Sequence, residues 1–120
     1  KILEDAYNDN KGITAEFNLN ILTRLNTELD TDFNIKEWKH YAFYNSKEGR
    51  IEMHLESLSK QDVNVDGDNI TFREEETILT EYSYKYSVGD FKNLISQSYN
   101  LEKVWTDEES KFGILYFTVK

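Results

Sequence analysis

The chain contains no cysteine and no proline among its 120 residues, and it has only five glycines. Without cysteine there is no disulfide, no thiol nucleophile and no thiolate ligand for a metal ion. None of the glycines belongs to a glycine-rich loop between a strand and a helix, so the sequence shows no cradle for a phosphate or a dinucleotide. No apolar run approaches the ~20 residues of a membrane span, and the amino end lacks a signal-peptide pattern. These absences favour a soluble, cytoplasmic protein.

Basic residues are also scarce. The chain has 14 of them against 23 acidic residues, which gives a formal net charge of −9. Nucleic acids and anionic membranes are bound through clustered Lys and Arg, so neither is an expected partner. Hydrophobic residues make up 38% of the chain and aromatic residues 14%. This balance predicts a core built more on Phe, Tyr and Trp than on aliphatic side chains.

The clearest helix is expected to begin at Thr14, a candidate N-cap, and to end near Asp30. Its apolar residues recur at helical spacing and predict one buried stripe. They are Phe17, Ile21, Leu22, Leu25 and Leu29. Asn18 and Asn20 are weak helix formers that serve either specific contacts or a solvated face, and the solvated face is the favoured interpretation. The preceding stretch, Lys1–Gly12, is typical of a turn-rich approach segment.

Strand patterns dominate the rest of the chain. In 50–58, apolar and polar residues alternate as they do in a half-buried strand, and a loop ending in Gly49 joins it to 39–44 in a hairpin. Asp66-Gly67 marks the tight turn of a second hairpin. Ser87 is a candidate N-cap for a second helix, and a final pair of strands is expected at 101–106 and 112–119. Together these patterns predict an α+β fold, with a mostly antiparallel sheet of about seven strands and two main helices.

One strand, Thr80–Ser87, carries an unusual pattern. Alternate side chains point to opposite faces of a strand. Three tyrosines (Tyr82, Tyr84, Tyr86) therefore share one face, and Glu81, Ser83 and Lys85 share the other. Either the tyrosine face lies in the core and the charged face in water, or the polar face binds a ligand. Glu81 and Ser83 would lie about 7 Å apart, close enough to hold two ends of one small polar molecule.

Metal and nucleophile chemistry have weak support. His54 lies between Glu52 and Glu56, but neighbours on one strand face are about 7 Å apart, too far to share one ion. A solvated face is the favoured interpretation, and no metal site is expected. No serine has the context of a nucleophile elbow, so no catalytic residue is predicted.

A more specific hypothesis is a ligand site formed by Met53 together with Glu81 and Ser83. Met53 is either core filling or the apolar neighbour of a ligand. An ionised Glu only accepts hydrogen bonds, whereas Ser donates or accepts. A buried carboxylate beside a hydroxyl and a thioether would suit a flat cationic or NH-bearing ring, and the pair would distinguish an imidazole by its two nitrogens.

Four stretches of the sequence are informative when taken together. They are AYNDNKGITAEFNLNIL, AFYNSKEGRIEMHL, ETILTEYSYKYS and VWTDEESKFGILYF. In order and spacing they resemble the carboxyl-terminal part of the histidine-specific, S-adenosylmethionine-dependent methyltransferases, and the resemblance covers nearly the whole chain. The best-known type trimethylates the α-amino group of L-histidine on the way to ergothioneine.

The resemblance implies a role for four residues. It implies that Met53 lies beside the imidazole of the substrate, that Glu81 and Ser83 bind its nitrogens, and that Tyr7 binds its carboxylate. It also implies two regions, an acceptor-binding region at 1–87 and a closing helix and β-hairpin of the methyltransferase sheet at 88–120. The expected ligand is a small histidine-like amino acid.

The family's cofactor site lies in a Rossmann-like portion that this sequence does not show. S-adenosylmethionine is therefore expected only in a longer parent protein, with no cofactor-binding residue in this chain. The chain alone is expected to be inactive, and the N-terminal Rossmann-like portion is its expected partner. The closing hairpin would have an unpaired edge, which predicts pairing with other strands of this chain or with another copy.

Two other hypotheses remain open. The chain could be a non-catalytic α+β module that captures a small cationic or heteroaromatic ligand. It could also be a structural α+β domain whose aromatic-rich core has no ligand.

Overall fold

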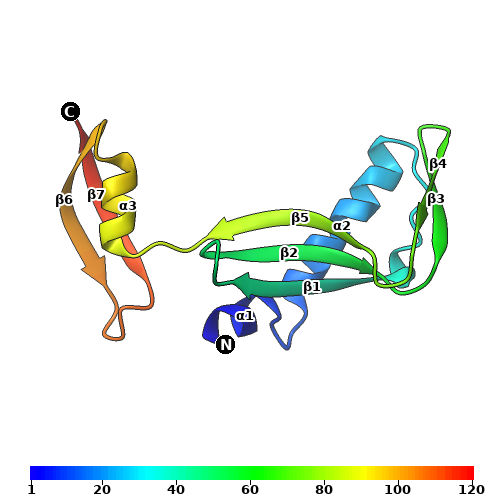
Figure 1. Cartoon of the computed structure of the whole chain (residues 1–120), viewed down its shortest axis with the longest axis horizontal. Coiled ribbons are helices and arrows are strands. Elements are labelled where there is room, and N and C mark those ends of the chain that lie inside the picture. The colour runs from blue at the N-terminus through cyan, green and yellow to red at the C-terminus, as the bar shows by residue number, and fades with distance from the viewer. The chain divides into compact units, whose positions relative to one another are not determined.

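Three antiparallel strands form the central sheet of residues Lys1–Tyr84, one of two compact units in the computed structural model, which describes residues 1–120. Their order is β1 (Trp38–Asn45), β2 (Arg50–Ser57) and β5 (Thr77–Tyr84). The hairpin of β3 (Gln61–Val65) and β4 (Asp68–Phe72) forms a separate sheet. The predicted α+β class is confirmed, and so is the antiparallel pairing. The strands nevertheless form several small sheets rather than a single one (Figure 1).

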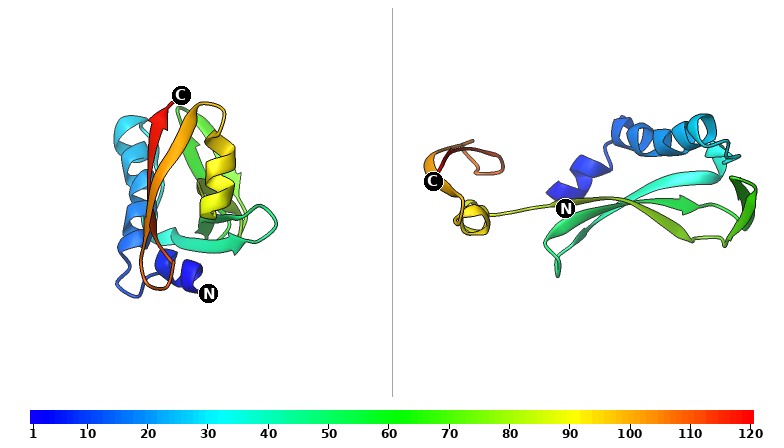
Figure 2. Two further views of the ribbon diagram at one scale, coloured as in Figure 1. Left: turned by 90° about the vertical axis from the view of Figure 1, so that its left-hand side faces the viewer. Right: turned by 90° about the horizontal axis from the view of Figure 1, so that it is seen from above.

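Helix α2 (Ile13–Glu28) packs against β1 and β2 on one face of the central sheet (Figure 2). The predicted buried stripe of this helix is partly wrong. Asn18 and Leu22 are buried, at 0% and 1% exposure, whereas Phe17 is 65% exposed and Leu29 55% exposed. Asn18 and Leu22 are four residues apart and share one face, and hydrogen bonds from Asn18 turn that face toward the sheet. Asn20 is exposed.

The start of α2 also differs from the prediction. Gly12 is the N-cap, and its φ of 72° is one that glycine adopts without strain. The carboxylate of Asp9 accepts hydrogen bonds from the backbone N–H groups of Ile13 (3.1 Å) and Thr14 (2.9 Å). These bonds hold the pKa of Asp9 below its usual value, the bond from Thr14 contributing most. Thr14 therefore lies inside the first turn, and Asp9 supplies the cap.

A short helix, α1 (Ile2–Tyr7), replaces the turn-rich segment that was predicted. Its end is fixed to β1 by side chains that bond the strand's backbone. Asn8 Nδ2 donates to the Ala42 carbonyl at 2.8 Å, and the Ala42 N–H donates to Asn8 Oδ1 at 3.3 Å. The Tyr44 N–H donates to Glu4 Oε1 at 3.1 Å. A helix of six residues is marginal by itself, so these tertiary bonds stabilise it.

The main core lies where α2, the 3-10 turn η1 (Ile35–Glu37) and the β3–β4 hairpin meet the sheet. Phe33, Trp38 and Phe72 form a cluster of rings, with the Phe33–Trp38 centroids 5.7 Å apart and the Trp38–Phe72 centroids 5.0 Å apart. The largest fully buried apolar side chains are nevertheless aliphatic. They are Leu22, Ile51, Leu55 and Val63. The core is therefore a mixture, less aromatic than composition alone suggests.

Strand β5 carries an irregularity in its pairing with β2. Glu81 lies opposite Met53, whereas Leu79 lies opposite His54, so the register shifts by one residue at Thr80. The Thr80 hydroxyl donates to the Met53 carbonyl at 3.0 Å. This is the pattern of a β-bulge.

Residues Lys85–Lys120 form the second unit. It contains α3 (Val88–Ile95) and the hairpin of β6 (Tyr99–Thr106) and β7 (Gly113–Val119). The predicted N-cap is present, because the Asp90 N–H donates to Ser87 Oγ at 3.1 Å. The two strands pair only with each other, so the expected pairing with other strands of the chain is not formed. None of the helices is long and apolar enough to cross a membrane.

Candidate functional site

The polar pair of β5 lies on the face of the central sheet that the helices cover. Glu81 stands opposite Met53, and Ser83 stands opposite Ile51. Residues directly opposite in an antiparallel pair point to the same side. Met53 and Ile51 are buried, at 2% and 0% exposure, and form a small apolar cluster. The structure thus brings together the three residues that the strand pattern singled out.

Tyr7 joins this group from α1. Its hydroxyl lies 2.8 Å from Ser83 Oγ, a hydrogen bond between residues 76 positions apart in the sequence. The Tyr7 side chain also packs against the cluster that contains Met53. All four predicted residues therefore meet at one place, where the end of α1 faces β2 and β5.

Two details of this arrangement differ from the sequence-based expectation. The carboxylate residue, Glu81, is exposed rather than buried, while Ser83 is half-buried. The tyrosine face of β5 does not lie in the core, because Tyr82 and Tyr84 are 45% and 46% exposed on the opposite side of the sheet. Tyr86 lies beyond the end of β5 at Tyr84.

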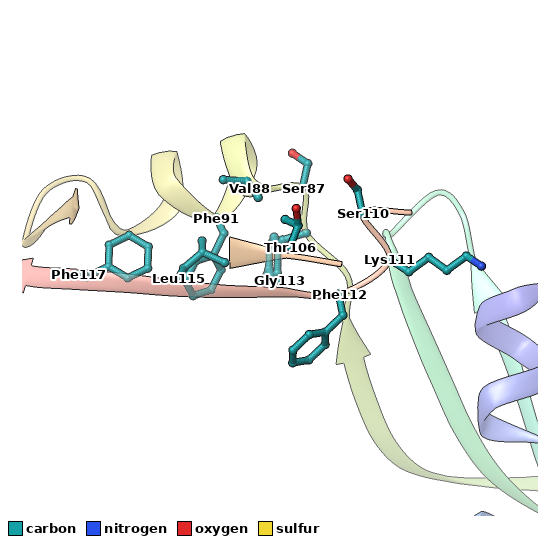
Figure 3. Close-up of a pocket in the computed structure, with 11 residues that line it drawn as sticks. Ser87, Val88, Phe91, Thr106, Ser110, Lys111, Phe112, Gly113, Leu115 and Phe117 are labelled. Atoms are coloured by element: carbon teal, nitrogen blue, oxygen red, sulfur yellow. The ribbon is translucent and has the colours of Figure 1, made fainter. Parts of the chain in front are cut away.

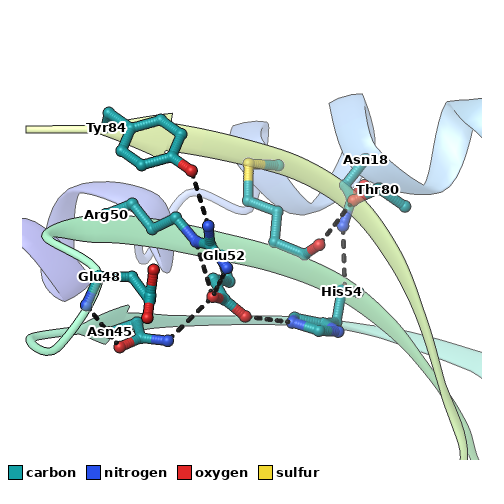
Figure 4. A network of polar contacts seen from close by, with 9 residues as sticks. Asn18, Asn45, Glu48, Arg50, Glu52, His54, Thr80 and Tyr84 are labelled. Carbon is teal, nitrogen blue, oxygen red and sulfur yellow. Dashed lines mark hydrogen bonds and ion pairs between the residues drawn. The ribbon is translucent and has the colours of Figure 1, made fainter.

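The opposite face of the sheet holds a network of charged groups (Figure 4). Arg50 donates to Glu52 Oε1 at 2.8 Å and to the Tyr84 hydroxyl at 2.7 Å, and its guanidinium lies 3.6 Å from the ring centre of Tyr82. Asn45 also donates to Glu52, at 3.0 Å. The row predicted to be solvated is therefore a paired network. No group of three or more His, Asp or Glu residues is placed to hold a metal ion.

Burial alone would raise the pKa of Glu52, which is only 8% exposed. The hydrogen bonds from Arg50 and Asn45, together with the nearby His54 ring, outweigh this, so the pKa of the carboxyl is lowered from its ordinary 4.5. His54 Nε2 lies 3.4 Å from the carboxylate, and its ring stacks on Phe43 with centroids 5.6 Å apart. This network fixes the outer side of the strand that presents Met53 on its inner side.

The lowered pKa of Glu52 predicts a pH-dependent stability. A carboxyl whose pKa is lower in the folded state stabilises the fold above its unfolded-state pKa, and that contribution is lost as the pH falls through the folded-state pKa. In urea unfolding measured from about pH 7 to about pH 2, the wild type should be more stable than Glu52→Gln at neutral pH. The difference should shrink on acidification below 4.5. A constant difference across this range would contradict the assignment.

The structure also shows two site-supporting residues that the sequence pattern did not identify. Asn18 on α2 donates from Nδ2 to His40 Nδ1 and to the His54 carbonyl, each at 3.0 Å. His40 Nε2 lies 2.7 Å from the Tyr7 carbonyl. The only sequence signal was an asparagine in a helix interior, where its propensity is poor. The favoured interpretation of Asn18 as a solvated residue is wrong.

A separate cavity of about 700 Å³ lies within residues Lys85–Lys120 (Figure 3). Its walls are mainly apolar and include Phe91, Leu115 and Phe117, with Phe112 at its rim. None of the four predicted site residues lines it. The cavity is thus a feature of the second unit and not part of the site around Tyr7.

The family of histidine-specific, SAM-dependent methyltransferases has a model that matches residues 1–119. The chain belongs to this family. It is 40% identical over 114 residues to a histidine N-alpha-methyltransferase of Mycobacterium tuberculosis, and 37% identical over 112 residues to one of Mycolicibacterium smegmatis. Each match covers 91% of this chain and 35% of the relative, so the chain spans about a third of the length of these relatives.

A third, more distant relative is a methyltransferase named for a different amino acid. It is an L-tryptophan methyltransferase of Psilocybe serbica, 28% identical over 85 residues, which are 69% of this chain and 24% of the relative. Imidazole and indole differ in their hydrogen-bonding nitrogens.

The residues of this chain do not fit the S-adenosylmethionine that the family name implies. A cofactor of this kind is commonly held by a glycine-rich turn between a parallel strand and a helix. Here every strand pair is antiparallel. Three turn glycines have positive φ, but Gly12 joins two helices, and Gly49 and Gly67 join antiparallel strands. These turns therefore do not form a recognisable cofactor cradle.

Proposed function

We propose that this chain binds the methyl acceptor of a SAM-dependent amino-acid N-methyltransferase, and that the acceptor is histidine, methylated on its α-amino group. The observation that carries the proposal is the meeting of Tyr7, Met53, Glu81 and Ser83 at one place in a chain of this family. Glu81 accepts a hydrogen bond from the imidazole N–H, and Ser83 donates to the second nitrogen. Met53 lies along the ring, and Tyr7 binds the carboxylate.

The geometry gives each contact a distinct task. Ser83 stands two residues from Glu81 on one strand face, so two nitrogens on opposite sides of an imidazole ring can be bound at once. In the ligand-free chain the Tyr7 hydroxyl and Ser83 share a hydrogen bond, and on binding the two hydroxyls exchange it for bonds to the carboxylate and to the ring of the amino acid. Binding both ends of the amino acid fixes the direction of its α-amino group. Methyl transfer requires such alignment of the acceptor in a site that excludes water.

The cofactor belongs, in this proposal, to a Rossmann-like portion outside this chain, and the chain alone is inactive. Residues 1–87 form the acceptor-binding region, and residues 88–120 close the methyltransferase sheet by packing on that portion. Exposed apolar side chains support the second role, since Leu94, Phe112 and Val119 are 61%, 68% and 77% exposed. A lone two-stranded hairpin is marginally stable in water, so such a unit gains from a further packing partner.

Calorimetric titration of the full-length protein tests the substrate. Histidine should bind at least about 100-fold more tightly than tryptophan, because indole offers one N–H and no acceptor nitrogen, which leaves the Ser83 hydroxyl without its partner in the ligand. A titration with alanine serves as the control for contacts to the carboxylate alone. Equal affinity for histidine and alanine would overturn the assignment of Glu81 and Ser83.

A further inference from the structure

A chain of hydrogen bonds passes from α2 through β1 to the last residue of α1. Asn18, at 0% exposure, donates to His40 Nδ1 at 3.0 Å, and His40 Nε2 lies 2.7 Å from the Tyr7 carbonyl. Asn18 also donates to the His54 carbonyl on β2, at 3.0 Å. A buried amide in a helix interior is costly unless it makes such bonds. These hydrogen bonds therefore connect α2, β1 and the end of α1 next to the backbone of Tyr7.

The partners define the protonation state of His40. The Tyr7 carbonyl only accepts a hydrogen bond, so His40 Nε2 must carry the proton and donate it. The Asn18 amide nitrogen only donates, so Nδ1 must be the bare, accepting nitrogen. The Asn18 amide is itself oriented by its second bond, because its NH₂ group and not its oxygen faces the His54 carbonyl. His40 is thus the neutral imidazole with its proton on Nε2.

The hydrogen bond from His40 holds the backbone of Tyr7, the residue of α1 whose hydroxyl lies at the candidate site. Tyr7 ends a helix of six residues, and its carbonyl is one of the end groups without a partner inside the helix. His40 satisfies that carbonyl, and on the other side of Tyr7 the hydroxyl lies 2.8 Å from Ser83 Oγ. The backbone and the hydroxyl of Tyr7 are therefore held from two different strands of the same sheet.

We propose that His40 is a positioning residue for the acceptor site, and that Asn18 sets the tautomer in which it works. The inference rests on the proposed function, in which Tyr7 binds the carboxylate of histidine. His40 does not touch the substrate. It fixes the end of α1 so that the Tyr7 hydroxyl stands beside Ser83 before the substrate arrives, which lowers the cost of ordering the site on binding.

A double-mutant cycle in the full-length protein separates positioning from general damage. Tyr7→Phe and His40→Leu should each weaken histidine binding about tenfold, the effect of one lost hydrogen bond. Together they should also weaken it only about tenfold, because His40 acts through the Tyr7 hydroxyl. His40→Gln, whose amide nitrogen can still donate to the Tyr7 carbonyl, should retain most of the affinity. Independent effects that multiply to about 100-fold would overturn the proposal, as would an unchanged affinity in His40→Leu.

Lys39→Leu is the matched control, since Lys39 is the neighbour of His40 on β1 but is exposed and points to the opposite face of the strand. It should leave histidine affinity unchanged. Nitrogen-15 NMR of histidine-labelled protein, with His40→Gln to assign the signal, gives a readout that needs no ligand. The neutral Nε2–H form is expected, and the Nδ1–H form or an imidazolium at neutral pH would overturn the assignment. If the wild type binds no histidine the proposed function fails, while the tautomer still decides the role of Asn18.

Discussion

Replacing Glu81 by alanine should weaken histidine binding to the full-length protein by about 30- to 100-fold. The ionised carboxylate accepts a hydrogen bond from the imidazole, and such charge-assisted bonds contribute roughly 1.5–3 kcal/mol. Glu81 is exposed and lies opposite the buried Met53, next to the register shift at Thr80, so the substitution removes the contact without removing a buried side chain. Glu81→Gln keeps an accepting oxygen and should lose less. Isothermal titration with histidine measures the affinities.

Glu74 provides the matched control for this measurement. It is an exposed glutamate in the turn before β5, so Glu74→Ala changes the net charge by the same amount without altering the site. Ser83→Ala should weaken binding about tenfold, because it removes one neutral hydrogen bond to the ring and the partner of the Tyr7 hydroxyl. Histidine binding that survives both Glu81→Ala and Ser83→Ala would remove this pocket assignment.

The largest effect on stability is expected from Leu55→Ala, which should lower the free energy of unfolding by about 2–5 kcal/mol. Leu55 is 0% exposed and packs in the main core with Leu22 and Trp38. Removing its side chain loses buried apolar area and leaves a cavity that helix and sheet cannot fully close. The midpoint and slope of urea unfolding measure the change.

Leu29→Ala is the corresponding control, because Leu29 follows the end of α2 and is 55% exposed. Its substitution should cost less than about 1 kcal/mol. Equal losses at the two positions would mean that the core does not centre on Leu55.

Local signals predicted the strands well, because turn chemistry and alternation act over a few residues. Asp66-Gly67 does form the turn of the β3–β4 hairpin, and Gly49 ends the loop between β1 and β2. Helix α1 was missed because only bonds to β1 stabilise it, and those bonds join residues far apart in the sequence. The buried face of α2 was misplaced because Asn18 is buried for its hydrogen bonds, which a hydrophobic pattern does not register.

For the candidate site, alternation along β5 correctly placed Glu81 and Ser83 on one face and Tyr82 and Tyr84 on the other. It did not show which face the helices cover, since that depends on the rest of the fold. The arrival of Tyr7 beside Ser83 followed from resemblance rather than from any periodicity. The binding roles of all four residues remain predictions for the titrations above.

The register shift at Thr80 also affects how this strand can change over evolution. On one side of the shift Ile78 packs in the main core, and on the other side Glu81 and Ser83 face the candidate site. In an uninterrupted strand, gain or loss of one residue would exchange the two faces along its whole length. The extra residue separates the two halves, so substitutions that alter ligand preference at one end of β5 need not alter the packing at the other. Specificity and stability can therefore diverge along a single strand.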